Sequence, residues 1–489
     1  MSENVKSKFS MPTKKLVTIL ICLGIIVLFW FLPAPEPMTQ TGMKVLGIFI
    51  GSVLMLSLVN TVWPVLLAVV LLSRVGMDPL NAIIAGSFGN WVIYFILMSF
   101  LLTHALEQSG FISRIVGKFM SMKFVTKTPW IFTFSLSAMG MILAAFIDQV
   151  PATAFMLAFA NTVYEEMGYE KGDSYPVIAN IATVFGVIIG GAATPISHPL
   201  ALIGLGVYES ITGEAISMLQ YLVLGVPTAI LVFIVMCIVL RIFAKPDFSK
   251  FENLNIDNIV KNQSPMEIKE KTIVTIFFLT VIMWMLPGVW ALFDPTSPVV
   301  AVLNTYGITF WAICAVILLS VIHIDDEPIL DIVYAVNHHI NWAILIFISI
   351  ALCLGSAVSN PATGISDYVV QNVTPLAEKF SPIIVVMLFV LVTCSLTNFA
   401  SNVTSITVMT GVAVTLAIAG TTYNAPAIAL AVTFAGSCAY TLPSGFAPIA
   451  MLHGNEYSNS SKIYKFGIIM IIVTTLLATF VGYNIASLI

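Results

Sequence analysis

The fold is indicated by an interruption in an otherwise apolar run, GGAATPISHP at residues 190–199, which divides the hydrophobic stretch 176–206. Glycine and proline are the residues that most disfavour the interior of a helix, so this run predicts a broken helix. A similar interruption, GSCAYTLPSGFAP at residues 436–448, divides the stretch 424–453 in the second half of the chain. Two such breaks at corresponding places predict an internal repeat.

The composition excludes most classes of protein. The chain has 489 residues, of which 59% are hydrophobic and 9% are charged. A soluble domain carries about 25% charged residues, so this surface faces lipid. The composition excludes a soluble enzyme, a disordered protein and a nucleic-acid binder. The formal net charge of −4 is too small to indicate a partner.

The apolar runs are long and continuous, which predicts transmembrane helices because lipid requires every backbone polar group to be bonded internally. We expect an all-α polytopic membrane protein with about 11 transmembrane helices, at 16–33, 43–59, 61–75, 88–107, 176–206, 218–243, 272–293, 307–323, 341–358, 424–453 and 463–487. Two further stretches, 128–164 and 380–422, have polar centres and exceed the roughly 20 residues of one span. Each is either a re-entrant hairpin or a pair of crossings.

The basic residues predict the orientation. With a cytoplasmic N-terminus and both long stretches returning to their starting side, every Lys and Arg except Lys44, Arg74 and Lys379 lies in a cytoplasmic segment. The positive-inside rule favours this arrangement. It predicts a multi-pass protein of the plasma membrane with its C-terminus outside.

The order of features repeats in the two halves. A span beginning at Trp91 or Trp342 is followed by an amphipathic connector, a stretch with a polar centre and a broken helix. Because the first stretch starts from the cytoplasm and the second from outside, the repeat is inverted. The predicted divisions are scaffold helices at 1–87, the first repeat at 88–243, a cytoplasmic linker at 244–271, second scaffold helices and a connector at 272–340, and the second repeat at 341–489.

Paired breaks in an inverted repeat are the sequence feature typical of a transporter's binding site. Carbonyl groups freed at a break suit Na⁺, and the N-termini of half-helices suit an anion. The chain contains no Gly-x-x-x-x-Gly-Lys-[Ser/Thr] motif for ATP, which favours secondary active transport. An intramembrane enzyme is disfavoured, since Asp148 is the only acid within the hairpins and broken helices and no His-Glu-x-x-His occurs.

At these residues the sequence resembles the divalent anion:sodium symporter family, which carries dicarboxylates, citrate and sulfate. Ser401-Asn402-Val403-Thr404 resembles the second of the family's two Ser-Asn-Thr tips, and the two breaks resemble its broken helices. The resemblance implies a homodimer with a fixed scaffold and a moving transport domain that carries both hairpins. It also implies elevator-type alternating access, with Na⁺ at each tip and no other cofactor.

The resemblance further implies the site residues. The expected Na⁺-binding residues are Asp148, Gln149, Gly190, Gly191, Thr194, Thr397, Ser401, Asn402, Ser437 and Ala439. The expected substrate-binding residues are Gln149, Val150, Ser197, His198, Ser401, Asn402, Val403, Thr404, Pro443, Ser444 and Gly445.

The first tip departs from the family pattern, because Asp148-Gln149-Val150 stands where Ser-Asn-Thr is expected. The asparagine of the expected Thr-Pro-Pro-Asn is also missing from both breaks. A carboxyl group at membrane depth is usually functional. Asp148 could be neutral, bind a cation, or carry a proton.

The sequence therefore predicts a secondary transporter, a Na⁺-coupled symporter of a di- or tricarboxylate or of sulfate. The alternative is a proton-coupled anion carrier or a cation:proton exchanger that uses Asp148. The anion is not identified by the sequence.

Overall fold

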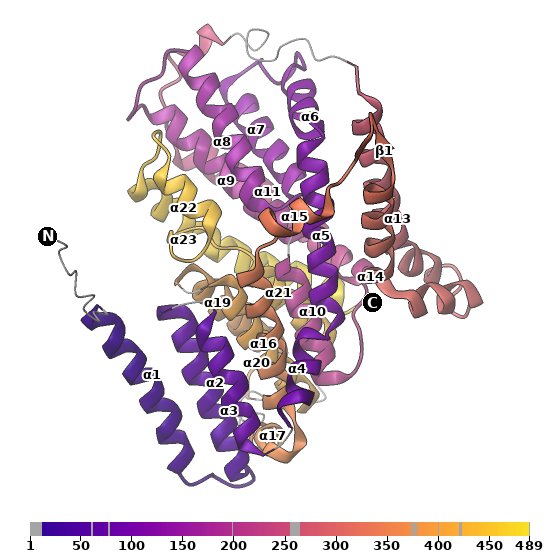
Figure 1. Cartoon of the computed structure of the whole chain (residues 1–489). Helices are drawn as coiled ribbons and strands as arrows, with labels where there is room; N and C mark the ends of the chain where they lie inside the picture. Colours follow the sequence, from indigo (N-terminus) through magenta and orange to yellow (C-terminus); the bar gives the residue numbers. More distant parts are fainter. Residues whose placement is uncertain are drawn as a thin grey trace, which may run out of the picture.

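The computed structural model is almost entirely helical (Figure 1). It describes residues 12–59, 62–76, 79–197, 199–254, 265–372, 375, 379–399, 401–419 and 423–488. Within these ranges the strands are β1 (His323–Ile324) and β2 (Glu327–Pro328), an antiparallel pair in which His323 lies opposite Pro328.

The first half of the chain forms the following elements. They are α1 (Thr13–Phe31), α2 (Gln40–Leu58), α3 (Trp63–Val75), α4 (Leu80–Phe88), α5 (Trp91–Gln108), α6 (Phe111–Met120), α7 (Pro129–Ala144), α8 (Gln149–Glu166), α9 (Ser174–Ala193), α10 (Pro199–Thr212), α11 (Met218–Phe243) and the 3₁₀ turn η1 (Phe251–Asn253).

The second half repeats this order after the linker. Its helices are α13 (Ile268–Ala291), α14 (Pro298–Val321), α15 (Ile332–His338), α16 (Trp342–Ser359), the 3₁₀ turn η2 (Pro361–Thr363), α17 (Ile365–Asn372), α19 (Pro382–Phe399), α20 (Asn402–Ala419), α21 (Ala425–Gly436), α22 (Ala447–Gly454), α23 (Ser460–Leu477), the π-helix η3 (Ala478–Tyr483) and α24 (Asn484–Ala486).

The predicted all-α polytopic membrane fold is confirmed. Each of the eleven predicted spans coincides with one helix or with consecutive helical elements, and each long polar-centred stretch forms two helices. By length and apolarity, eight helices of the described part can cross a membrane. Among the shorter apolar helices, α10 and α21 are short because a break divides the segment to which each belongs.

Matching local signals set the starts of equivalent helices. The side chain of Asn90 caps α5 by accepting the N–H of Val92, and the side chain of Asn341 caps α16 by accepting the N–H of Ile344. Each follows a short helix, α4 or α15, that the sequence analysis did not separate. Such caps satisfy donors that would otherwise be unbonded at a helix start, which fixes where α5 and α16 begin.

The two halves are interlocked. Hairpin α7–α8 packs against α9, and hairpin α19–α20 packs against α21. The helix after each break packs against the hairpin of the other half: α10 contacts α20, and α22 contacts α8. Helices α5 and α16 also contact the opposite half. Helix α5 of the first half packs on α13 and α14 of the second, and α16 of the second half packs on α2 and α3 of the first. In Figure 1, α7 and α8 lie in the upper half and α20 in the lower half.

Close packing of α7 against α9 depends on small residues. A Cβ atom on Gly190 would overlap the carbonyl group of Met141, and one on Gly191 would overlap the side chain of Gln149. Backbone atoms cannot rotate away, so glycine is required at position 190.

We therefore expect Gly190→Ala to destabilise the folded protein by about 1–3 kcal/mol, as overpacking does. The measurement is the thermal melting temperature of the purified protein in detergent. Gly24→Ala is the matched control, because a Cβ atom there meets no heavy atom within 4 Å. Equal melting temperatures for the two variants would contradict the packing argument.

Candidate functional site

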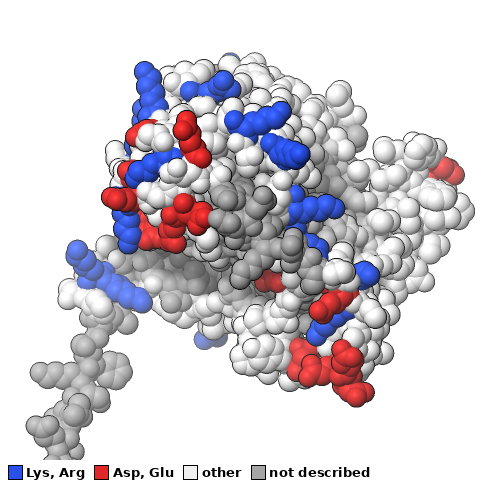
Figure 2. Space-filling view, turned by 90° about the horizontal axis from the view of Figure 1, so that it is seen from above, with Lys and Arg blue, Asp and Glu red and all other residues white. Residues whose placement is uncertain are grey.

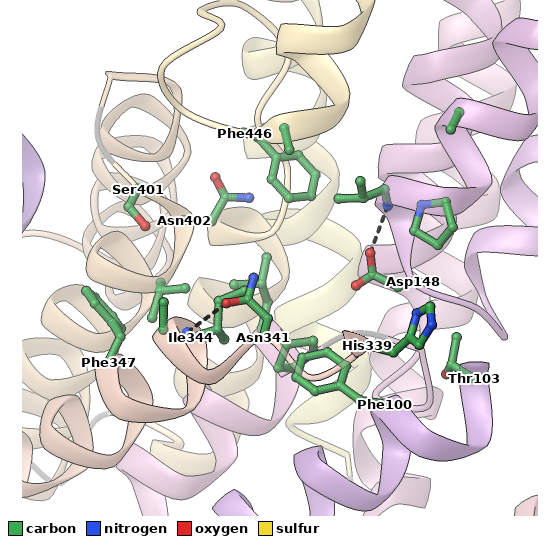
Figure 3. Close-up of a pocket in the computed structure, with 18 of the residues that line it drawn as sticks. Phe100, Thr103, Asp148, His339, Asn341, Ile344, Phe347, Ser401, Asn402 and Phe446 are labelled. Carbon is green, nitrogen blue, oxygen red and sulfur yellow. Dashed lines mark hydrogen bonds between the residues drawn. The ribbon is translucent and has the colours of Figure 1, made fainter. Parts of the chain in front are cut away.

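Both tips and both breaks border a single cavity of about 710 Å³. Its lining includes Asp148 and Val150 from the first tip, Pro199 and Leu200 after the first break, Ser401, Asn402 and Val403 from the second tip, and Pro443, Ser444, Gly445, Phe446 and Ala447 from the second break. Figure 3 shows Ser401 and Asn402 on one side of the cavity and Asp148 on the opposite side. The structure thus brings together segments that are distant in the sequence.

At the first tip, Asp148 is the N-cap of α8. Its Oδ1 atom accepts the N–H of Val150 at 2.8 Å, and this half-buried carboxyl group borders the cavity. A carboxylate at a helix N-terminus is stabilised by the helix dipole and by the capping bond. This backbone contact fixes the Asp148 carboxyl group at the start of α8.

Gln149 points away from the cavity. Its side chain is completely buried, and Nε2 donates to the carbonyl oxygen of Ile188 at 3.0 Å. Its Oε1 atom has no hydrogen-bond partner among the described residues, and neither has the hydroxyl of Thr153. The Gln149 amide therefore lies beside Gly191 of α9 and not against the space that a substrate would occupy.

The first break is bonded to the first tip. The hydroxyl of Thr194 donates to the carbonyl oxygen of Ala145, and the hydroxyl of Ser197 donates to that of Ala144. Both carbonyl groups lie at the end of α7, so the break supplies the partners that the helix end lacks. Of the predicted residues in this region, His198 lies outside the described residues.

At the second tip, Asn402 is 3% exposed and neither its Oδ1 nor its Nδ2 atom has a hydrogen-bond partner among the described residues. The hydroxyl of Thr404, 4% exposed, is likewise without a partner there. Buried polar groups are normally bonded, so two such side chains beside one cavity indicate a binding site.

Asn398 organises the second break and was missed by the sequence analysis. Its Oδ1 atom accepts the N–H of Tyr440 at 2.7 Å and that of Thr441 at 2.9 Å. Its Nδ2 atom donates to the carbonyl oxygen of Cys394 at 2.6 Å. The only sequence signal was a second asparagine one helical turn before Asn402.

The remaining predicted cation ligands lie beside this network. The hydroxyl of Thr397 donates to the carbonyl oxygen of Gly436 at 2.6 Å, and the hydroxyl of Ser437 donates to that of Thr433 at 2.9 Å. Ala439 is completely buried in the break. The oxygen atoms of this region are of the kind that Na⁺ prefers, and each hydroxyl keeps a lone pair for a further ligand.

Two walls of the cavity were not predicted. Helix α5 contributes Phe100, Thr103, His104 and Glu107, and the α15–α16 segment contributes His339, Asn341, Ala343, Ile344 and Phe347. The rings of His104 and His339 stack with centroids 3.6 Å apart. Of these residues, Glu107 could have been predicted from the sequence, because an ionisable residue within an apolar span is commonly functional.

The connector at 323–339 is rich in His, Asp and Glu side chains. Among the described residues, no group of three or more His, Cys, Asp and Glu side chains is placed to hold a metal ion. His339 differs from the rest of the connector, because it lines the cavity.

A side-chain hydrogen bond joins α5 to α10. Trp91 Nε1 donates to Glu209 Oε2 at 2.8 Å, close to a second cavity of about 350 Å³ that Asn90, Ser210 and Asn360 help to line. Trp91 also accepts the hydroxyl of Thr309 from α14 through its carbonyl oxygen at 3.4 Å.

Charged side chains gather on the face drawn in Figure 2, where Lys and Arg lie among Asp and Glu. Ion pairs between charged side chains also join distant segments of the chain. Arg114 of α6 contacts Glu270 of α13 at 2.6 Å, and Lys250 of the linker contacts Asp173 at 2.9 Å. The N–H of Glu170 and the Lys250 ammonium both hold the pKa of Asp173 below its ordinary value.

The sequence is similar to those of known transporters. Residues 13–488 match the family model described as sodium:sulfate symporter transmembrane region. The sodium-dependent dicarboxylate transporter SdcS of Staphylococcus saprophyticus is 25% identical over 78% of this chain and 74% of its own length. An uncharacterized transporter of Methanocaldococcus jannaschii is 26% identical over 69% of this chain and 70% of its own length.

A solved structure shares the fold. The crystal structure of the YdaH transporter of Alcanivorax borkumensis superposes with a TM-score of 0.56 at 14% identity, covering 97% of this chain and 99% of that one. At this level of identity the likeness concerns the fold alone.

Proposed function

The chain belongs to the sodium:sulfate symporter transmembrane region family, and from this premise we propose that it is a secondary transporter that couples the movement of a small anion to Na⁺. The anion is a di- or tricarboxylate or sulfate. The observation that carries the proposal is the meeting of both tips and both breaks at one cavity. The family indicates a transport role and not catalysis.

Na⁺ binds at the two tips in this proposal. The first site draws on Asp148 and Gln149 with the buried backbone of Gly190, Gly191 and Thr194, and the second on Thr397, Ser401, Asn402, Ser437 and Ala439. The support is chemical, since these residues concentrate hydroxyl, amide and carbonyl oxygen atoms at buried helix ends. The substrate lies between the tips, against Val150, Ser401, Asn402, Val403 and the segment 443–445.

Transport follows an elevator movement. The segments 128–164, 179–206, 380–422 and 425–453 move as one body, because each hairpin packs against a broken helix and each broken helix reaches the other half. Residues before 81 and the segment 272–323 stay fixed at the interface of a homodimer. We assign α5 to the fixed body, because it packs mainly on α13 and α14 and its Phe95 ring lies 5.0 Å from Trp284.

The protein lies in the plasma membrane with a cytoplasmic N-terminus and an external C-terminus. The mixed charged face of Figure 2 is the cytoplasmic face in this proposal.

The test is uptake of labelled succinate, citrate and sulfate into proteoliposomes that contain the purified protein. We expect an inward Na⁺ gradient to drive accumulation of at least one of these anions above its external concentration. Liposomes with choline in place of Na⁺ are the control. Equal uptake with and without Na⁺ for every anion would refute Na⁺ coupling.

A further inference from the structure

Apolar side chains line the cavity from both of the bodies that we propose to move past each other. Phe446 of the second break lines it from the moving body. Phe100 of α5 and Ile344 and Phe347 of α16 line it from the other side. Figure 3 shows Phe446 above the cavity and Phe100 and Phe347 below it. We call these four residues the apolar band.

The apolar band presents surface that a ligand can cover. Phe100, Ile344 and Phe446 are only half-buried, and all three border the cavity. Apolar surface beside a water-accessible space is stabilised when another apolar group covers it. The band therefore favours a ligand that has an apolar part.

The second tip supplies a contact of the opposite kind. Asn402 lines the cavity and is 3% exposed, and both polar atoms of its amide are without partners among the described residues. The first N–H groups of α20 also lack intrahelical partners and carry the positive end of the helix dipole. The Nδ2 atom of Asn402 is a donor suited to a carboxylate oxygen, and its Oδ1 atom remains available to Na⁺.

The size of the cavity agrees with a ligand larger than a short unbranched carboxylate. Its volume of about 710 Å³ lies within the range of about 300–1,000 Å³ that is typical of sites for drug-sized ligands. Such sites are lined mainly by hydrophobic and aromatic side chains, with a few polar groups that fix the orientation of the ligand. Here the apolar band supplies the hydrophobic lining, and the second tip supplies the polar groups.

We propose that the transported anion is a carboxylate that bears an apolar substituent, which lies between Phe446 and the rings of Phe100 and Phe347 while a carboxylate group contacts Asn402 and the start of α20. This proposal rests on the proposed Na⁺-coupled transport and narrows its substrate class. A phenyl group is the substituent that fits best, because aromatic rings pack favourably against one another. Phe100 is then a residue that determines specificity, and sulfate, which has no apolar part, is disfavoured.

Succinate and 2-phenylsuccinate form a matched pair for the test, because they differ by one phenyl group and carry the same two carboxylates. In proteoliposomes with an inward Na⁺ gradient, we expect the KM for labelled phenylsuccinate to be at least about tenfold lower than that for succinate, since binding removes the phenyl ring from water. The comparison uses the unmodified protein, so it does not depend on the folding of any variant.

Phe100→Ala removes one ring of the apolar band. We expect the preference for phenylsuccinate over succinate, measured as the ratio of the two KM values, to fall to about threefold or less in this variant. Tyr94→Ala is the matched control, because Tyr94 is an aromatic residue of the same helix, is 49% exposed and is not among the residues that line the cavity. It should keep the full preference.

An apolar band that serves only as a sliding surface between the two bodies would give a different result. Phe100→Ala would then change the maximum rates for succinate and phenylsuccinate by the same factor and leave the ratio of their KM values as in the unmodified protein. That result refutes the contact between Phe100 and the substituent.

The remaining outcomes separate this inference from the proposed function. Na⁺-driven succinate uptake with a KM equal to or below that for phenylsuccinate refutes the apolar substituent and leaves Na⁺-coupled anion transport standing. Phenylsuccinate that inhibits succinate uptake without being taken up refutes it in the same way. If Na⁺ drives uptake of none of succinate, phenylsuccinate, citrate and sulfate, the proposed function fails and this inference fails with it.

Discussion

Replacing Asn402 with alanine is expected to raise the Na⁺ concentration needed for half-maximal transport at least about tenfold. The side chain is buried at the start of α20, and neither polar atom has a partner among the described residues. A hydrogen bond or ligand contact to a charged group contributes about 1.5–3 kcal/mol, which corresponds to about 10-fold to 150-fold in affinity.

The measurement is initial uptake at a saturating anion concentration over a series of Na⁺ concentrations. Asn484→Ala is the matched control, because Asn484 is exposed and bonds only to the carbonyl oxygen of Phe480 in its own helical segment. Unchanged activation by Na⁺ in Asn402→Ala would remove this residue from the cation site.

Crosslinking α5 to α10 is expected to abolish transport. Trp91 of α5, which we assign to the fixed body, donates a hydrogen bond to Glu209. Glu209 lies in the last turn of α10, the helix that begins within the moving segment 179–206. Cysteines at these two positions, joined by a short thiol-specific crosslinker, would hold the two bodies in the conformation seen here. An elevator movement needs them to slide past each other.

The experiment uses a background in which the six native cysteines are replaced, since all of them are free thiols in the structure. Transport should disappear on crosslinking and return when a reducible crosslinker is cleaved. Each single-cysteine variant treated with the same reagent is the control. Full activity after efficient crosslinking would exclude a relative movement of α5 and α10.

The helices could be predicted from the sequence because lipid leaves the backbone few choices. Apolar runs marked the spans, and the glycine and proline positions at 190–199 and 436–448 marked both breaks. The short helix α4 before Trp91 was not predicted, because the predicted spans at 61–75 and 88–107 left residues 80–87 outside any helix. The side chain of Asn90 caps α5 and so separates it from α4.

The site was predictable only in part. The residues of the second tip are local in the sequence, and Ser401, Asn402 and Val403 do line the cavity. The wall formed by α5 depends on how two distant segments pack, and no short-range pattern relates His104 to His339. The hydrogen bond between Asp148 and the N–H of Val150 was also not predicted. An acid at the start of an apolar helix is typical of a functional residue and equally of a helix cap, so the sequence does not distinguish the two.

The central claim is that Na⁺ and the substrate bind at the same cavity and strengthen each other's binding. The most direct measurement is calorimetric titration of the purified protein with succinate and with citrate, at several Na⁺ concentrations and with choline as the substitute. We expect Na⁺ to raise the affinity for at least one of these carboxylates and that carboxylate to raise the affinity for Na⁺ by the same factor, as linkage requires. Binding of both carboxylates that is independent of Na⁺ would contradict the account.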